Sequence, residues 1–90
     1  MKTAAFPLER NAAFVVDPWN VLLLNDDWHT FEEVVFQVAK ATGCTMEQAL
    51  EIAFEAHTYG EAVCFTGPKG KCEGVAGVLK EIDLGVRLAP

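Results

Sequence analysis

Two helix-start signals of the same kind stand close together in the middle of this chain and restrict its fold more than any other feature. Thr30 with Glu33, and then Thr45 with Gln48, have the spacing of a capping box, in which the two side chains and backbone amides satisfy one another. Apolar residues recur at helical intervals after each signal. The sequence therefore predicts two consecutive helices. They cover about residues 31–42 and 46–58.

Strand-like segments surround this helix pair. A mostly apolar run of strand length comes before it, and a β-branched and aromatic run bounded by glycines comes after it. A turn is then expected at residues 67–70, followed by a helix, with a last strand closing the chain. The strands are predicted at residues 19–24, 62–66 and 84–88. The apolar stripe of the third helix comprises Cys72, Val75, Ala76 and Leu79.

The predicted order is strand, two helices, strand, helix, strand. Three helices packed against one face of a three-stranded antiparallel sheet would bury all the apolar stripes, which makes the fold class α+β. We expect residues 1–17 to be a short N-terminal extension, partly pairing through residues 12–16, and residues 18–90 to form the domain. Ninety residues leave no room for a second domain and favour a surface groove over a deep catalytic chamber.

Charge and cysteine usage restrict the partners and the compartment. The formal net charge of −6 repels a phosphate backbone, so nucleic acid is not an expected partner. Such a charge suits a positively charged peptide end, but it also simply keeps a small domain soluble. Three cysteines without C-x-x-C spacing suggest neither a disulfide framework nor a zinc site. With no signal peptide or membrane span expected, the cytoplasm is the predicted location.

Polar residues at the ends of predicted elements form a candidate binding site. Asn25, Asp26 and Asp27 follow the first strand, and His57 lies near the end of the second helix. Their oxygens and a neutral imidazole nitrogen can accept hydrogen bonds from an ammonium group, while Phe31 and nearby apolar side chains can take up a hydrophobic group. Together these residue types describe a receptor for a free amino terminus and its first side chain.

Each of these residues also has a purely structural interpretation. An Asn-Asp-Asp segment is often a solvated turn that caps the next helix. Histidine near a helix C-terminus suits the helix dipole, and Phe31 and Val34 are residue types common in a core. Residue types and spacing alone therefore leave both interpretations open.

Two separated motifs resemble the ClpS family of protease adaptors. Residues 19–27, WNVLLLNDD, are similar to the family's strand and N-D-D signature. Glu47-Gln48-Ala49 and then residues 56–64, AHTYGEAVC, are similar to its E-x-A and V-H-x-x-G-x-A-V-C patterns, at the family's separation from N-D-D. The resemblance is close over residues 18–66 and weaker elsewhere.

This resemblance implies an adaptor without catalytic activity or cofactor that recognises N-degrons, usually an N-terminal Leu, Phe, Tyr or Trp. It implies that the adaptor delivers them as a monomer to a ClpA- or ClpC-like AAA+ unfoldase. Asn25, Asp27 and His57 would hold the α-amino group, and Asp26 would support the acidic loop. The implied hydrophobic pocket comprises Leu23, Leu24, His29, Phe31, Val34, Ala53, Ala56 and Leu84.

The chain departs from the family pattern at several of these positions. His29 stands where the family usually has Thr, and Phe31 where it usually has Met. Ala53 and Ala56 replace residues that are commonly Met and Val, so we expect a shifted preference among large hydrophobic N-terminal residues. The sequence near residues 73–75 does not show the lysine with which the family docks on its unfoldase, and the last helix and N-terminal extension are short.

Three alternatives remain open from the sequence. The chain could be a divergent ClpS-like domain with another specificity or partner. A metal-dependent hydrolase could use Asp26, Asp27, His29 and His57 as ligands, although no H-E-x-x-H motif accompanies them. A scaffold that docks on a partner protein is the third alternative, because the C-terminal domain of ribosomal protein L7/L12 is similar in architecture to ClpS.

Overall fold

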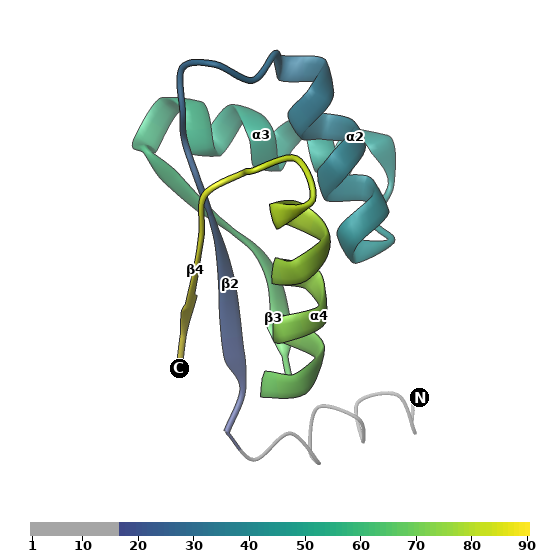
Figure 1. The fold of residues 1–90 in the computed structure, drawn as a ribbon, viewed down its shortest axis with the longest axis vertical. Coiled ribbons are helices and arrows are strands. Elements are labelled where there is room, and N and C mark those ends of the chain that lie inside the picture. Colours follow the sequence, from purple (N-terminus) through teal and green to yellow (C-terminus); the bar gives the residue numbers. More distant parts are fainter. Residues whose placement is uncertain (1–16) are drawn as a thin grey trace, which may run out of the picture.

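The computed structural model describes residues 17–90 and contains three strands and three helices in the order β-α-α-β-α-β. The α+β fold with a three-stranded antiparallel sheet is thus confirmed (Figure 1). The pairing expected within residues 12–16 lies outside the described residues. The elements are β2 (Trp19–Leu24), α2 (Phe31–Thr42), α3 (Met46–Tyr59), β3 (Glu61–Gly67), α4 (Lys69–Lys80) and β4 (Val86–Ala89).

The first strand along the described chain becomes the central strand of the sheet. The order is β3-β2-β4, and β2 pairs antiparallel with both neighbours. The register with β3 shifts between Val21 and Leu22, as at a β-bulge. Because β2 is flanked on both sides, the residues that follow it emerge between the C-terminal end of α3 and the turn before β4. Figure 1 shows this end of the sheet with α3 lying across it.

The sheet buries one set of alternating side chains beneath the helices. Val21 and Leu23 on β2 are at most 1% exposed, and α4 packs against all three strands. Opposite this face, Arg87 and Glu61 form an exposed ion pair at 2.8 Å. The core is one cluster that contains Val21, Leu23, Val35, Val38, Ala49, Ala53, Ala56, Ala62, Cys64, Cys72, Val75, Leu79 and Leu84.

Both predicted capping boxes are present. The hydroxyls of Thr30 and Thr45 accept from the amides three residues on, and the side chains of Glu33 and Gln48 accept from the threonine amides in return. Gly60 ends α3 at a φ of 91°, a left-handed conformation that favours glycine. Helix α2 has the predicted bounds, and α3 extends one residue beyond the prediction.

The C-terminal third departs from the predicted boundaries. The turn predicted at residues 67–70 is wrong, because β3 continues to Gly67 and α4 begins at Lys69. The ammonium of Lys69 lies 4.8 Å from the centre of the Trp19 ring, a cation–π contact between this helix start and β2. β4 begins at Val86, two residues later than predicted, because residues 81–85 form a turn in which Asp83 has a φ of 62°. No helix within residues 17–90 is long and apolar enough to span a bilayer.

The three cysteines are free thiols in different environments. Burial raises the pKa of Cys64 to about 12, and the fully buried Cys72 sulfur lies against the carbonyls of Trp19 and Gly67. Cys44 is only half-buried. At about pH 8 we therefore expect an aromatic disulfide reagent to label one thiol quickly and the other two only on unfolding. Cys44→Ala should remove the fast phase, whereas three equally fast thiols in the folded protein would contradict this prediction.

Candidate functional site

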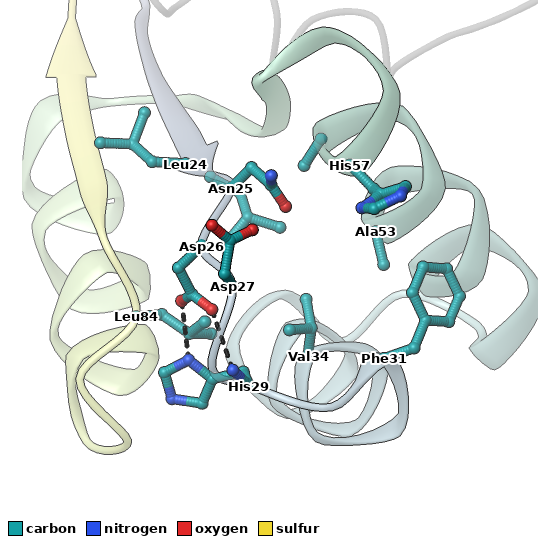
Figure 2. A pocket seen from close by; sticks show the side chains of 12 residues that line it. Leu24, Asn25, Asp26, Asp27, His29, Phe31, Val34, Ala53, His57 and Leu84 are labelled. Atoms are coloured by element: carbon teal, nitrogen blue, oxygen red, sulfur yellow. Dashed lines mark hydrogen bonds and ion pairs between the residues drawn. The ribbon is translucent and has the colours of Figure 1, made fainter.

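A pocket of about 280 Å³ opens at the end of the sheet where β2 gives way to the loop of residues 25–29. Its walls come from this loop, the first turns of α2, the second half of α3 and the turn before β4 (Figure 2). All the site residues predicted from the sequence line this one pocket, and their roles in binding stay predictions. The lining residues are Leu23, Leu24, Asn25, Asp26, Asp27, His29, Phe31, Val34, Ala53, Ala56, His57 and Leu84.

The pocket has an apolar floor and a polar mouth. Leu23, Ala53, Ala56 and Leu84 are each at most 3% exposed. At the mouth, the exposed side chains of Asn25 and Asp27 lie on one side and His57 lies on the other (Figure 2). Because polar acceptors and buried apolar walls share a small volume, the pocket suits a compact ligand that joins a hydrogen-bond donor to an apolar group.

Backbone hydrogen bonds hold the polar loop in place on both sides. The Leu24 amide donates to the Gly85 carbonyl at 2.9 Å, and the Asn25 amide donates to the Gly60 carbonyl at 3.0 Å. A side chain at Gly85 would approach the Leu24 Cβ to 3.3 Å, so the absence of a side chain permits this close approach. The loop is therefore clamped between the end of α3, which carries His57, and the turn that supplies Leu84.

Asp26 turns its carboxylate into its own loop. Its Oδ1 accepts from the amides of Trp28 and His29 at 3.1 and 2.9 Å, and its Oδ2 lies 2.7 Å from His29 Nδ1 (Figure 2). Burial raises the pKa of Asp26, but the hydrogen bonds from the His29 amide and imidazole and the Trp28 amide outweigh burial, so the net pKa is lowered. The carboxylate is thus ionised at neutral pH and already engaged.

The opposite nitrogen of His29 contacts a segment far away in the sequence. Nε2 is hydrogen-bonded to the carbonyl of Ile82, in the turn before β4. The hydrogen bond to Asp26, followed by the one to Ile82, raises the pKa of His29 above its ordinary value. His29 is predictable as part of the pocket wall, but Ile82 is not, because Ile82 contributes a backbone carbonyl that gives no signal in residue type.

Phe31 and Val34 reach the pocket because the first capping box starts α2 at Phe31. Val34 is half-buried in the wall, while Phe31 is 39% exposed beside the mouth. In Figure 2 the Phe31 ring lies on the side of the pocket that carries Ala53 and His57. The interpretation of Phe31 as a core residue is therefore wrong, because the start of α2 extends past the core cluster.

The described residues offer no evident metal centre. Within residues 17–90, no three His, Cys, Asp or Glu side chains are arranged so that they could share an ion. Asp26 and His29 instead hydrogen-bond to each other. The side-chain geometry thus gives no support to the hydrolase alternative that uses Asp26, Asp27, His29 and His57 as ligands.

Comparison with solved structures shows a chain with the same fold. The structure described as Agrobacterium tumefaciens ClpS2 bound to L-phenylalaninamide superposes with a TM-score of 0.76, covering 81% of this chain and 95% of that one. The two sequences are 22% identical over this alignment, so the likeness concerns the fold.

Curated relatives match this chain over stretches of 48 to 78 residues. The ATP-dependent Clp protease adapter protein ClpS of Leptospira biflexa is 40% identical over 48 residues, which are 53% of this chain and 42% of that protein. The E3 ubiquitin-protein ligase UBR2 of Homo sapiens is 27% identical over 78 residues, 87% of this chain and 4% of the ligase. The mouse UBR2 is 33% identical over 52 residues, 58% of this chain and 3% of the ligase. The chain thus spans less than half the length of each of these relatives.

The family comparison covers most of the domain. The sequence model described as ATP-dependent Clp protease adaptor protein ClpS matches residues 16–83, a range that contains both motifs and all the pocket residues except Leu84. The fold, the order of the elements and this match agree. The chain therefore belongs to the ClpS family of ATP-dependent Clp protease adaptor proteins.

Proposed function

We propose that this chain binds the free N-terminal residue of N-degron substrates, with a large hydrophobic first side chain, and delivers them to a Clp AAA+ unfoldase. The observation that carries the proposal is the pocket of about 280 Å³, in which hydrogen-bond acceptors surround the mouth above an apolar floor. A volume of this size matches one amino-acid residue better than a long peptide. Binding, with no catalytic step, is the proposed activity.

In this proposal the acceptors at the mouth hold the α-ammonium group. Asn25 Oδ1, the Asp27 carboxylate and a neutral His57 nitrogen supply charge-assisted hydrogen bonds, which are about twice as strong as neutral ones. Asp26 supports the loop, since its oxygens already accept from Trp28 and His29. The peptide continues outward into solvent from the open side.

The first side chain of the substrate occupies the apolar part of the pocket. Leu23, Ala53, Ala56 and Leu84 form its floor, and Val34 and Phe31 stand at its side. Two alanines on α3 leave room that longer side chains would fill, whereas the Phe31 ring narrows the approach. We therefore propose that the preference is shifted within the set Leu, Phe, Tyr and Trp.

The ligand of the solved structure with the same fold supports this ligand class. Agrobacterium tumefaciens ClpS2 is bound to L-phenylalaninamide, a molecule that carries a free α-amine beside a benzyl group. The same pair of chemical groups is what the polar mouth and apolar floor of this pocket would accommodate. The Leptospira relative is named an adapter of the ATP-dependent Clp protease, which supports delivery to a Clp unfoldase.

A binding module with a different partner is the second candidate, and α4 carries the observation that favours it. Where the family has a docking lysine, this chain has Glu73, Gly74 and Val75, and Val75 is only 7% exposed. A buried valine cannot replace a surface ammonium in docking. Binding of N-terminal residues would persist in this case, but no ClpA- or ClpC-like unfoldase would be recruited.

Fluorescence anisotropy with short labelled peptides tests the first step. The peptides differ only in the first residue, and each has an N-acetylated twin. We expect free Leu, Phe, Tyr and Trp termini to bind at least tenfold more tightly than a free Gly terminus, because the apolar floor is then filled. The N-acetylated peptides should not bind the protein at any concentration used, because they lack the charged α-amine. Equal affinity for Leu and Phe would contradict the shifted preference, and no binding to any peptide would overturn the function.

A further inference from the structure

The His29 imidazole is held between two groups that can only accept hydrogen bonds. Nδ1 lies 2.7 Å from the Asp26 carboxylate, and Nε2 is bonded to the Ile82 carbonyl. A neutral imidazole has a proton on one nitrogen, so it can donate to one of these partners and leaves the other facing a lone pair. An imidazolium donates to both. The geometry therefore selects the doubly protonated form of His29.

The surroundings of the ring favour the same form. The side chains of His29 and Asp26 are 15% and 16% exposed, so water screens their interaction less than at the surface. Asp27 on the same loop, Glu33 on α2 and Asp83 on the turn before β4 add negative charge nearby, and His57 faces the same pocket from α3. The two bonds raise the pKa of His29, with Asp26 contributing first and Ile82 second.

The two ends of this bridge belong to the two segments that shape one side of the pocket. Asp26 stands between Asn25 and Asp27, the acceptors proposed for the ammonium group. Ile82 precedes Leu84, a buried part of the apolar floor, by two residues. Losing the bridge would remove the hydrogen bond that joins the polar loop to the turn, while the backbone bond between Leu24 at the end of β2 and Gly85 would remain.

We propose that His29 is a positioning residue of the pocket: as an imidazolium it ties the loop of the ammonium acceptors to the turn that supplies Leu84, and thereby holds the pocket mouth in its binding shape. This role rests on the proposed function, because the ligand of the pocket is the same N-terminal residue. As a consequence, the affinity for the peptide depends on the charge of His29, although His29 does not contact the peptide's amine.

The sign of the pH dependence follows from the direction of the pKa shift. Because the pKa of His29 is raised in the folded protein, the bridge is complete below the ordinary histidine pKa and is lost as pH rises through the raised value. Asp26 has a lowered pKa, so its half of the bridge is lost only under acid conditions. Affinity should thus fall on the alkaline side through His29.

The peptide α-amine also titrates in this assay and has to be separated from His29. It loses its proton with a pKa of about 7.7–8.0, which weakens binding to any form of the protein. Taking the ratio of the wild-type and His29→Gln affinities at each pH cancels this effect.

The experiment combines nitrogen-detected NMR of the histidine rings with peptide binding between about pH 6 and pH 9. The chain has two histidines, so a His57→Gln sample assigns the spectrum. We expect both ring nitrogens of wild-type His29 to be protonated at pH 6.5, and Asp26→Asn to lower the pKa of His29 because its first hydrogen-bond partner loses its charge. His29→Gln should bind a Phe-starting peptide about tenfold more weakly at pH 6.5, with the ratio approaching one at pH 9.

The outcomes separate the positioning role from the function beneath it. If His29 is singly protonated at pH 6.5 and its pKa is the same in the wild type and in Asp26→Asn, the bridge is overturned. This result does not depend on whether His29→Gln folds. Equal affinity of wild type and His29→Gln at every pH would overturn the positioning role and leave the proposed function standing. A doubly protonated His29 in a protein that binds no peptide would overturn both the positioning role and the proposed function. The bridge would then be a structural feature only.

Discussion

Asp27→Asn is expected to weaken binding of a Phe- or Leu-starting peptide by roughly 10- to 100-fold. The substitution keeps the size of the side chain and an acceptor oxygen but removes a negative charge at the pocket mouth, where we propose that the ammonium group binds. A hydrogen bond to a charged group is worth about 1.5–3 kcal/mol, and each 1.4 kcal/mol changes affinity about tenfold. Anisotropy titration at pH 7 with the free and acetylated peptides measures the change.

Glu55→Gln is the matched control for this variant. It removes the same unit of charge from an exposed position on α3 that does not line the pocket. If the acceptor at the mouth matters, this control keeps nearly wild-type affinity, because an exposed charge outside the pocket is screened by salt. Equal losses in the two variants would instead mean that the net charge of −6 attracts peptides without a specific contact.

Leu79→Ala is expected to lower the free energy of unfolding by about 3 kcal/mol, within the range of about 2–5 kcal/mol for a fully buried leucine. Leu79 is 0% exposed in the core cluster between α4 and the sheet. A domain of this size has a total stability of roughly 5–13 kcal/mol, so one truncation removes a large share. Urea unfolding followed by the fluorescence of Trp19 and Trp28 measures the shift of the midpoint.

Leu50→Ala provides the comparison within the same protein. Leu50 also lies in a helix, α3, but is 48% exposed, so its truncation leaves no internal cavity. We expect a change within about 0.5 kcal/mol. If both variants shifted the midpoint equally, the burial of Leu79 in the core cluster would not explain the loss of stability.

The helix pair could be predicted accurately because its signals are local. A capping box involves residues three apart, and each of Thr30 and Thr45 has its partner within the same turn of helix. β2 is equally predictable from the sequence, since a mostly apolar run that is followed by Asn25 can be recognised without any distant residue. These elements keep their predicted bounds to within one residue.

The start of α4 could not be predicted from local signals. Its N-cap, Pro68, makes no side-chain capping bond, and glycines at 70, 74 and 77 are poor helix formers. The helix forms from Lys69 nonetheless, because Cys72, Val75, Ala76 and Leu79 are buried against the sheet. Tertiary packing therefore overrides propensity here, and it also buries Gln37, whose amide donates to the Val78 carbonyl at 2.6 Å.

The pocket residues are predictable from residue types and from the family resemblance, but their convergence is a property of the folded chain. Short segments specify the helix pair, the central strand and the N-D-D loop, and the hydrogen bond between Asp26 and His29 also spans only three residues. Leu84 reaches the pocket floor, and the Ile82 carbonyl reaches the His29 imidazole, through the packing of the folded chain. These two contacts join segments far apart in the sequence, and their geometry follows from how the helices pack on the sheet.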